Sequence, residues 1–211
     1  APNIRMQFIL DIVAMTFGQP LALFPAIGVL ILGGGPITVG VLTASIAIGA
    51  LLSSLFSGRI GTVRRQGVGI ELAIMAYGVF IGLFGAVLLV AALGWMSPGG
   101  VSETQPNLPL IAIACVFLAA AGAADNISSI FRNTMMQAAV PDDVRGRLQG
   151  IFVVVITGGP RLGALYAGVL SSTAGLWFPP LLGGIAIFGL CALLVRLNPR
   201  FRQYDALEPV P

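Results

Sequence analysis

The chain contains no histidine and no lysine, and only two cysteines among its 211 residues. Without histidine, the common zinc sites and the serine–histidine–aspartate triad cannot be built. Cys115 and Cys191 lie within apolar runs, where a thiol serves as a small hydrophobic side chain and not as part of a disulfide framework. The sequence also lacks a glycine-rich phosphate loop and a nucleophile elbow. We therefore expect no enzyme activity, no metal and no cofactor.

Charge is scarce as well. Charged residues make up 9% of the chain and hydrophobic residues 57%, whereas an ordinary soluble domain carries roughly 25% charged residues. A folded surface in water needs more solvated groups than this chain can supply. The net charge of +3 comes from arginines without a basic, aromatic-rich face, so we expect no nucleic-acid partner. The composition predicts an all-α integral membrane protein that lies in a lipid bilayer.

Apolar runs of the length that spans a membrane, about 20 residues, occur six times. They cover about 6–30, 37–57, 68–93, 109–131, 148–171 and 178–197. Residues 1–197 are thus predicted to form one six-span unit, followed by a polar tail at 198–211. A fourth helix that continued to Val140 would be about 48 Å long, against a hydrocarbon core of about 30 Å. We expect it to leave the bilayer near Arg132 and to end at Pro141.

Arginine is distributed on one side of the predicted membrane only. By the positive-inside rule that side is cytoplasmic, which places both ends of this segment in the cytoplasm. The arginines of this side are Arg5, Arg59, Arg64, Arg65, Arg132, Arg145, Arg147, Arg196, Arg200 and Arg202.

Ionisable side chains within the spans are candidates for function, because a charge in lipid is costly unless it is paired or hydrated. Asp125 shares one helix face with Ser129 and Arg132. It is either a proton-titrating or substrate-facing acid, or an acid tied to Arg132 or Arg161. Asp11 in the first span is either a coupling acid or the partner of a cytoplasmic arginine.

Two further charges have structural interpretations beside the functional one, and for Glu71 the structural interpretation is favoured. Arg161 lies in the segment Gly158–Gly163, where a proline and glycines predict a bent helix that faces a cavity or a carboxylate; a structural ion pair is the alternative. Glu71 follows a helix start, where an acid is favourable, and is expected to pair with Arg64 or Arg65. Glycine pairs at 78/82 and 159/163 predict close helix packing.

These residues carry a resemblance to a known family. The segment 11–25, DIVAMTFGQPLALFP, is similar to the seventh helix of the enterobactin-exporter-like efflux proteins, a subgroup of the major facilitator superfamily. Residues 125–147 are similar to the tenth helix and the following loop of that subgroup, and GGPRLG at 158–163 to its eleventh helix. The turn GRIGTVRR at 58–65 resembles a degenerate form of the family's cytoplasmic loop motif, without the usual acid before its first basic residue. The chain thus resembles the C-terminal six-helix half of a twelve-helix bundle.

The resemblance implies a proton-coupled efflux transporter of the cell's inner membrane. Two six-helix halves would rock about a central site, and proton uptake would drive export of a siderophore or another hydrophobic small molecule. It implies a missing N-terminal half, and a start at Ala-Pro-Asn also hints at a fragment. The substrate or proton pathway would include Asp11, Asp125 and Arg161. The cytoplasmic gating turns would include Arg59, Arg64, Arg65, Arg132, Asp142, Arg145 and Arg147.

A second interpretation belongs to another class of protein. Six spans without a transport cycle would form a membrane assembly partner or a channel-like module. The full gene distinguishes the two, because an upstream segment with six further spans and a similar cytoplasmic turn would support half of a transporter.

Overall fold

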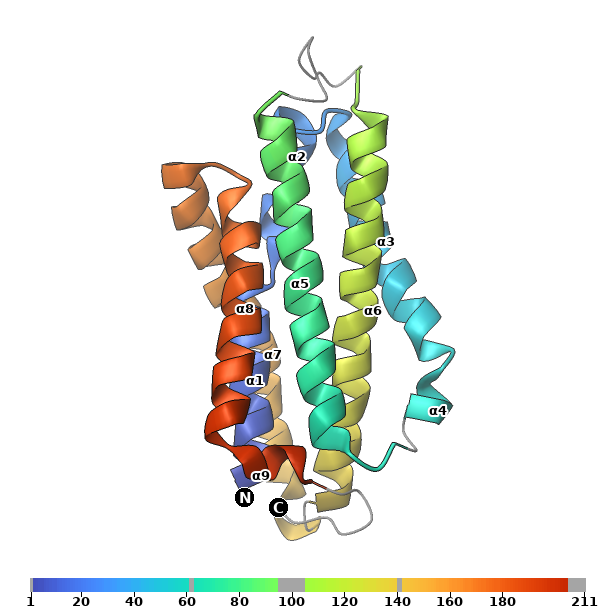
Figure 1. Cartoon of the computed structure of the whole chain (residues 1–211), viewed down its shortest axis with the longest axis vertical. Coiled ribbons are helices and arrows are strands. Elements are labelled where there is room, and N and C mark those ends of the chain that lie inside the picture. The colour runs from blue at the N-terminus through green and yellow to red at the C-terminus, as the bar shows by residue number, and fades with distance from the viewer. Residues whose placement is uncertain (1, 61–62, 95–104, 140–141, 205–211) are drawn as a thin grey trace.

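The computed structural model describes residues 2–60, 63–94, 105–139 and 142–204, and in these ranges every regular element is a helix (Figure 1). Six helical segments are long and apolar enough to cross a membrane. The prediction of an all-α protein with six spans is therefore confirmed.

The first span is built from three pieces, and the other five are single helices (Figure 1). The predicted ranges overlap all six spans. The observed helices, which include the short α4 and α9 near the ends of spans, are α1 (Pro2–Phe17), the 3-10 turn η1 (Pro20–Leu23), α2 (Phe24–Leu30), α3 (Gly35–Ser54), α4 (Ser57–Ile60), α5 (Gln66–Ala92), α6 (Leu108–Ala139), α7 (Asp142–Ala174), α8 (Phe178–Leu197) and α9 (Pro199–Arg202).

The break in the first span follows from its prolines. Pro20 has no backbone N–H and its ring clashes with the preceding turn, so the helix cannot continue through it. A broken helix leaves backbone carbonyls without partners, which is costly in a membrane. The hydroxyl of Tyr77 on α5 donates a hydrogen bond to one of them, the carbonyl of Gly18. A side chain at position 18 would overlap the Tyr77 ring, so only glycine fits here.

The helices approach one another closely at glycines. A Cβ on Gly49 of α3 or on Gly122 of α6 would collide with the backbone of the other helix. The predicted packing of two glycine pairs is also found. Gly78 and Gly82 of α5 face Gly184 of α8, and a Cβ on Gly159 of α7 would lie 2.7 Å from the Met15 side chain of α1.

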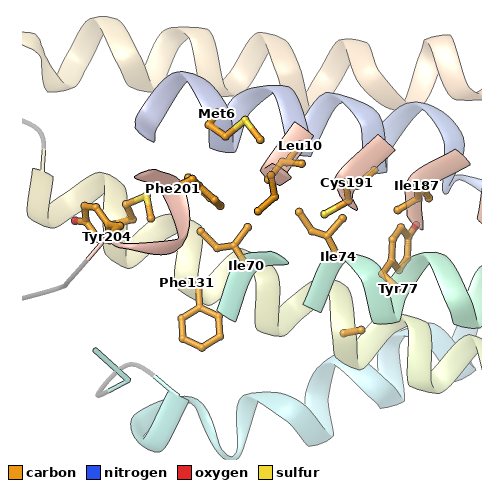
Figure 2. Close-up of a cluster of buried hydrophobic side chains, with 14 of the residues drawn as sticks. Met6, Leu10, Ile70, Ile74, Tyr77, Phe131, Ile187, Cys191, Phe201 and Tyr204 are labelled. Carbon is orange, nitrogen blue, oxygen red and sulfur yellow. The ribbon is translucent and has the colours of Figure 1, made fainter. Parts of the chain in front are cut away.

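The helix arrangement places α5 between α6 and α8, with α3 against α6 and α1 between α7 and α8 (Figure 1). The start of α1 and the helix α9 lie at one end of the bundle (Figure 1), which we call the terminal end. A buried apolar cluster fills the interior there (Figure 2), and its members include Leu10, Ile70, Ile74, Tyr77, Phe131 and Phe201. A second cluster, which includes Phe24 and Phe84, fills the opposite half.

Candidate functional site

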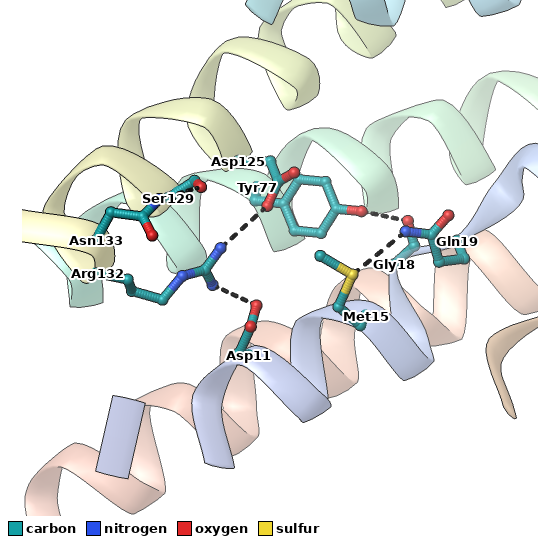
Figure 3. Close-up of polar contacts among 9 residues, drawn as sticks. All are labelled: Asp11, Met15, Gly18, Gln19, Tyr77, Asp125, Ser129, Arg132 and Asn133. Carbon is teal, nitrogen blue, oxygen red and sulfur yellow. Dashed lines mark hydrogen bonds and ion pairs between the residues drawn. The ribbon is translucent and has the colours of Figure 1, made fainter. Parts of the chain in front are cut away.

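A buried arginine lies between two acids in the terminal half of the bundle (Figure 3). Arg132 Nη1 on α6 is 2.7 Å from Asp11 Oδ1 on α1, and Arg132 Nη2 is 3.8 Å from Asp125 Oδ1 on its own helix. The exposed fractions of the side chains are 5% for Arg132, 2% for Asp11 and 39% for Asp125. Asp125 and Arg132 are two helical turns apart, so they share one face of α6. The sequence predicted both acids as candidates, and the structure brings them to the same cation.

The contact between Arg132 and Asp11 is a close ion pair with poor hydrogen-bond geometry. Although the two atoms are 2.7 Å apart, neither Asp11 Oδ1 nor Arg132 Nη1 forms a hydrogen bond with any described residue, and Arg132 Nε is equally unsatisfied. A buried ion pair is strongly stabilising only when its remaining polar atoms are also satisfied. The charges therefore attract one another, but this arrangement has little surplus stability to resist a rearrangement.

Tyr77 belongs to the same group of residues. Its hydroxyl holds the broken end of α1 at Gly18, and it interacts electrostatically with Asp125 and Arg132. Figure 3 shows the side chain reaching from α5 to α1, on the far side of Asp125 from the arginine head group. Tyr77 was not predicted from the sequence. A polar hydroxyl within a long apolar run was the only signal that could have found it.

Further polar side chains of α6 lie beside the acids. Ser129 Oγ accepts a hydrogen bond from Asn133 Nδ2 at 3.4 Å, whereas the buried Ser128 Oγ has no hydrogen-bond partner among the described residues. Asn126, which the sequence analysis also missed, ties α6 to α3. Its Nδ2 donates to Ser53 Oγ at 2.8 Å and Ser54 Oγ at 3.0 Å.

Arg161 does not join this site. It lies on α7 next to Pro160, its side chain is exposed, and no described residue forms an ion pair with it. Much of this helix is uncovered, including Leu162, Leu165 and Val169. A pathway role for Arg161 stays a prediction.

Glu71 pairs with an arginine that the sequence did not suggest. Arg202 of α9 donates from Nε and Nη2 to the two Glu71 oxygens at 2.6 and 2.7 Å. Those hydrogen bonds and the carboxylate charge raise the pKa of Arg202. The expectation named Arg64 or Arg65 because they are near in sequence. Gly67, one turn before Glu71, packs against the Phe201 backbone, so this face of α5 meets the end of the chain instead.

The residues predicted to form gating turns differ in their burial. Arg64, Arg65 and Arg147 are exposed, whereas Arg132 is buried with the acids. The side chains of Arg59, Asp142 and Arg145 lie outside the described residues.

Comparison with known proteins found similarity to exporters. The chain is 28% identical over 172 residues to "Enterobactin exporter EntS" of Shigella flexneri, a match that covers 78% of this chain and 36% of that protein. The protein of the same name from Escherichia coli O157:H7 gives 28% identity over 172 residues, covering 78% and 35%. The chain thus spans about a third of the length of the curated relatives it matches. No family model and no solved structure matches. Together with its six apolar helices, this likeness indicates a multi-pass membrane protein similar to an efflux transporter.

Proposed function

We propose that the chain is the C-terminal half of a major facilitator superfamily efflux transporter, which exports a siderophore or another hydrophobic small molecule in exchange for protons. The observation that carries this proposal is that one buried arginine, Arg132, is shared by acids on two different helices. The similarity to enterobactin exporters supports the direction of transport and the substrate class.

The shared arginine couples protonation to helix contacts. Asp125 is 39% exposed, so a proton can reach it, whereas Asp11 is almost completely buried. A neutral Asp125 no longer attracts Arg132, which then pairs with Asp11 alone and holds α1 against α6. Deprotonation restores the competition for the arginine and loosens α1. Proton binding thereby biases one of two arrangements, as alternating access requires.

The uncovered face of α7 supports a missing partner. This helix is the least buried of the six spans, and it exposes Arg161 deep within its length. A guanidinium facing lipid at this depth would be costly. In our proposal an N-terminal six-helix half covers this face, and Arg161 faces the cavity between the halves, where it contacts an anionic substrate.

The distribution of arginine supports an orientation in the inner membrane. Seven described arginines, namely Arg5, Arg64, Arg65, Arg147, Arg196, Arg200 and Arg202, have exposed side chains and lie at or beyond span ends. By the positive-inside rule the terminal end, together with both ends of this segment, faces the cytoplasm. The exposed gating residues Arg64, Arg65 and Arg147 then lie where a cytoplasmic latch between helices would break and re-form.

The test is export by the full-length protein in cells, with a panel of siderophores and dyes and with or without a proton uncoupler. We expect uncoupler-sensitive export by the wild type and loss of export in Asp125→Asn. Ser129→Ala, one turn along the same face, is the matched control and should export normally. Membrane insertion is measured for each variant by fluorescence-detected gel filtration.

Two outcomes would contradict the proposal in different ways. Normal export by Asp125→Asn would remove Asp125 from the proton pathway and leave Asp11 as the candidate. Failure of the complete protein to export any compound would instead favour the six-span assembly or channel-like module.

A further inference from the structure

A basic cavity lies at the terminal end, on the outside of the bundle. It has a volume of about 420 Å³ and is lined by Arg65, Val68, Arg202 and Gln203. The first two residues mark the start of α5, and the last two belong to α9 and the residue after it. The cavity therefore lies where the short helix α9 folds back beside the beginning of α5.

The cavity carries a net positive charge. Arg202 is held in place by its two hydrogen bonds to Glu71, which use Nε and Nη2 and leave other guanidinium N–H groups to bind a ligand. Glu71 neutralises one of the two arginines. Arg65 is exposed and forms no ion pair with a described residue, so no described carboxylate compensates its charge. An anion would find two guanidinium groups here, of which one is held in place by Glu71.

An apolar groove lies deeper on the same side of the bundle. Between α5 and α8 it encloses about 430 Å³, and its lining includes Val79, Gly82, Leu83, Ile185, Phe188 and Gly189. Among the described residues, no charged or hydrogen-bonding side chain lines it. Several of these residues are exposed, for example Ile185 at 63%. In a membrane this groove faces the hydrocarbon chains of lipids.

The cavity and the groove lie along the same face of α5. On α5, Val68, Met75, Val79 and Gly82 follow one another at intervals of seven, four and three residues, so they form one stripe along the helix. The groove begins at Gly78, about 15 Å further along the helix than Val68 at 1.5 Å per residue. One leaflet of the hydrocarbon core is also about 15 Å thick. An acyl chain whose head group is bound beside Val68 is therefore long enough to reach the start of the groove. On α8, Arg196 lies on the same helix face as the groove-lining positions 185, 188 and 189, nearer the terminal end.

We propose that the cavity and groove together bind one anionic phospholipid of the leaflet at the terminal end. The phosphate receives hydrogen bonds from Arg65 and Arg202, because guanidinium groups match phosphate oxygens in geometry and charge. An acyl chain follows the stripe from Val68 into the groove. Basic pockets beside membrane helices are suited to lipid head groups, and the apolar continuation selects a lipid over a soluble phosphate. The site does not require the transport function proposed above.

The head-group part is tested by native mass spectrometry of the full-length protein in detergent, titrated with dioleoyl phosphatidylglycerol or dioleoyl phosphatidylcholine. We expect the anionic lipid to bind at least fivefold more tightly. Arg65→Gln should weaken its binding about fivefold, since each arginine near an anionic head group contributes about that factor. Arg147→Gln, an exposed arginine on α7, is the matched control and should bind like the wild type.

The acyl-chain part is tested by filling the groove. A Cβ on Gly189 meets no described residue within 4 Å, so Gly189→Leu adds bulk to the groove without disturbing the packing of α8. We expect this variant to lose affinity for phosphatidylglycerol. Gly40→Leu on α3 also adds a side chain in open space, outside the groove, and should have no effect. Gel-filtration profiles that match the wild type establish that the variants are folded.

Several results would overturn the proposal. Equal affinity for the two lipids, or unchanged binding by Arg65→Gln, would exclude recognition of the anionic head group at this cavity. Binding of sn-glycerol 3-phosphate as tight as that of the lipid, with no effect of Gly189→Leu, would replace the lipid site by a soluble-phosphate site. None of these results alters the expected export phenotype of Asp125→Asn, so the two proposals fail independently.

Discussion

Arg132 Nη1 of α6 lies 2.7 Å from Asp11 Oδ1 of α1, and both side chains are almost completely buried. The two helices share few other contacts, because α1 packs mainly against α7 and α8. This ion pair is therefore a principal tie between the first span and α6.

Replacing Asp11 should destabilise the protein more than replacing Asp125. Asp11→Asn leaves Arg132 buried with only the 3.8 Å contact to Asp125, and removing one partner of a buried pair costs about 3–5 kcal/mol. Asp125 is far more exposed, so solvent compensates for its loss and the cost is smaller. Thermal unfolding of the purified variants measures the difference. The double variant Asp11→Asn/Arg132→Gln should recover part of the stability, and a result below either single variant would contradict the pairing.

The close packing of α3 against α6 gives a second prediction. A methyl group at Gly49 would meet the Ala119 carbonyl, and backbone cannot move aside as a flexible side chain can. Gly49→Ala should therefore lower stability by about 1–3 kcal/mol, the usual cost of overpacking. Gly40→Ala on the same helix adds its methyl group in open space and should be neutral or stabilising. Equal unfolding temperatures for the two variants would show that the helices separate easily.

The ion pair between Glu71 and Arg202 gives a third prediction, on the fixation of α9. Glu71→Gln removes the charge that holds Arg202 in two hydrogen bonds, while Arg200 and Arg202 remain available to trypsin. We expect trypsin to cleave the folded variant at these arginines faster than it cleaves the wild type. Mass spectrometry of the fragments measures the rate. Asp125→Asn, which also removes one carboxylate but lies away from α9, is the control. An unchanged cleavage rate would mean that Phe201 packing alone fixes α9.

Sequence reasoning succeeded where the bilayer imposes a local requirement. A span needs about 20 apolar residues in succession, so the six spans were readable from 57% hydrophobic residues and their interruptions. Asp125 and Arg132 were readable as a pair because they are two turns apart on one helix. The contact of Arg132 with Asp11 was only one of several open pairings, because it joins helices distant in sequence.

Where tertiary structure decides, the sequence was insufficient. Glu71 was assigned to neighbouring arginines, but α9 returns to α5 and brings Arg202 to it. Tyr77 and Asn126 were missed because each acts across a helix interface that no local pattern describes. The partner of Arg161 could not be found, since no described residue of this chain supplies one.

The hydrogen bond at the break in the first span gives a fourth prediction. Tyr77→Phe removes the donor to the Gly18 carbonyl, which is then left without its partner at the end of α1. A net loss of about 1 kcal/mol is expected, in line with single side-chain hydrogen bonds in proteins. Tyr166→Phe is the matched control, because the Tyr166 hydroxyl also donates to a backbone carbonyl, that of Pro179 at 3.2 Å, but from a partly exposed position away from the break in the first span. If Tyr77→Phe unfolds at the temperature of Tyr166→Phe or above it, the hydroxyl is not needed to hold the broken helix. If it unfolds lower and also exports more slowly, with Tyr166→Phe unchanged, then the position of Gly18, which Tyr77 fixes, matters for the transport cycle as well as for stability.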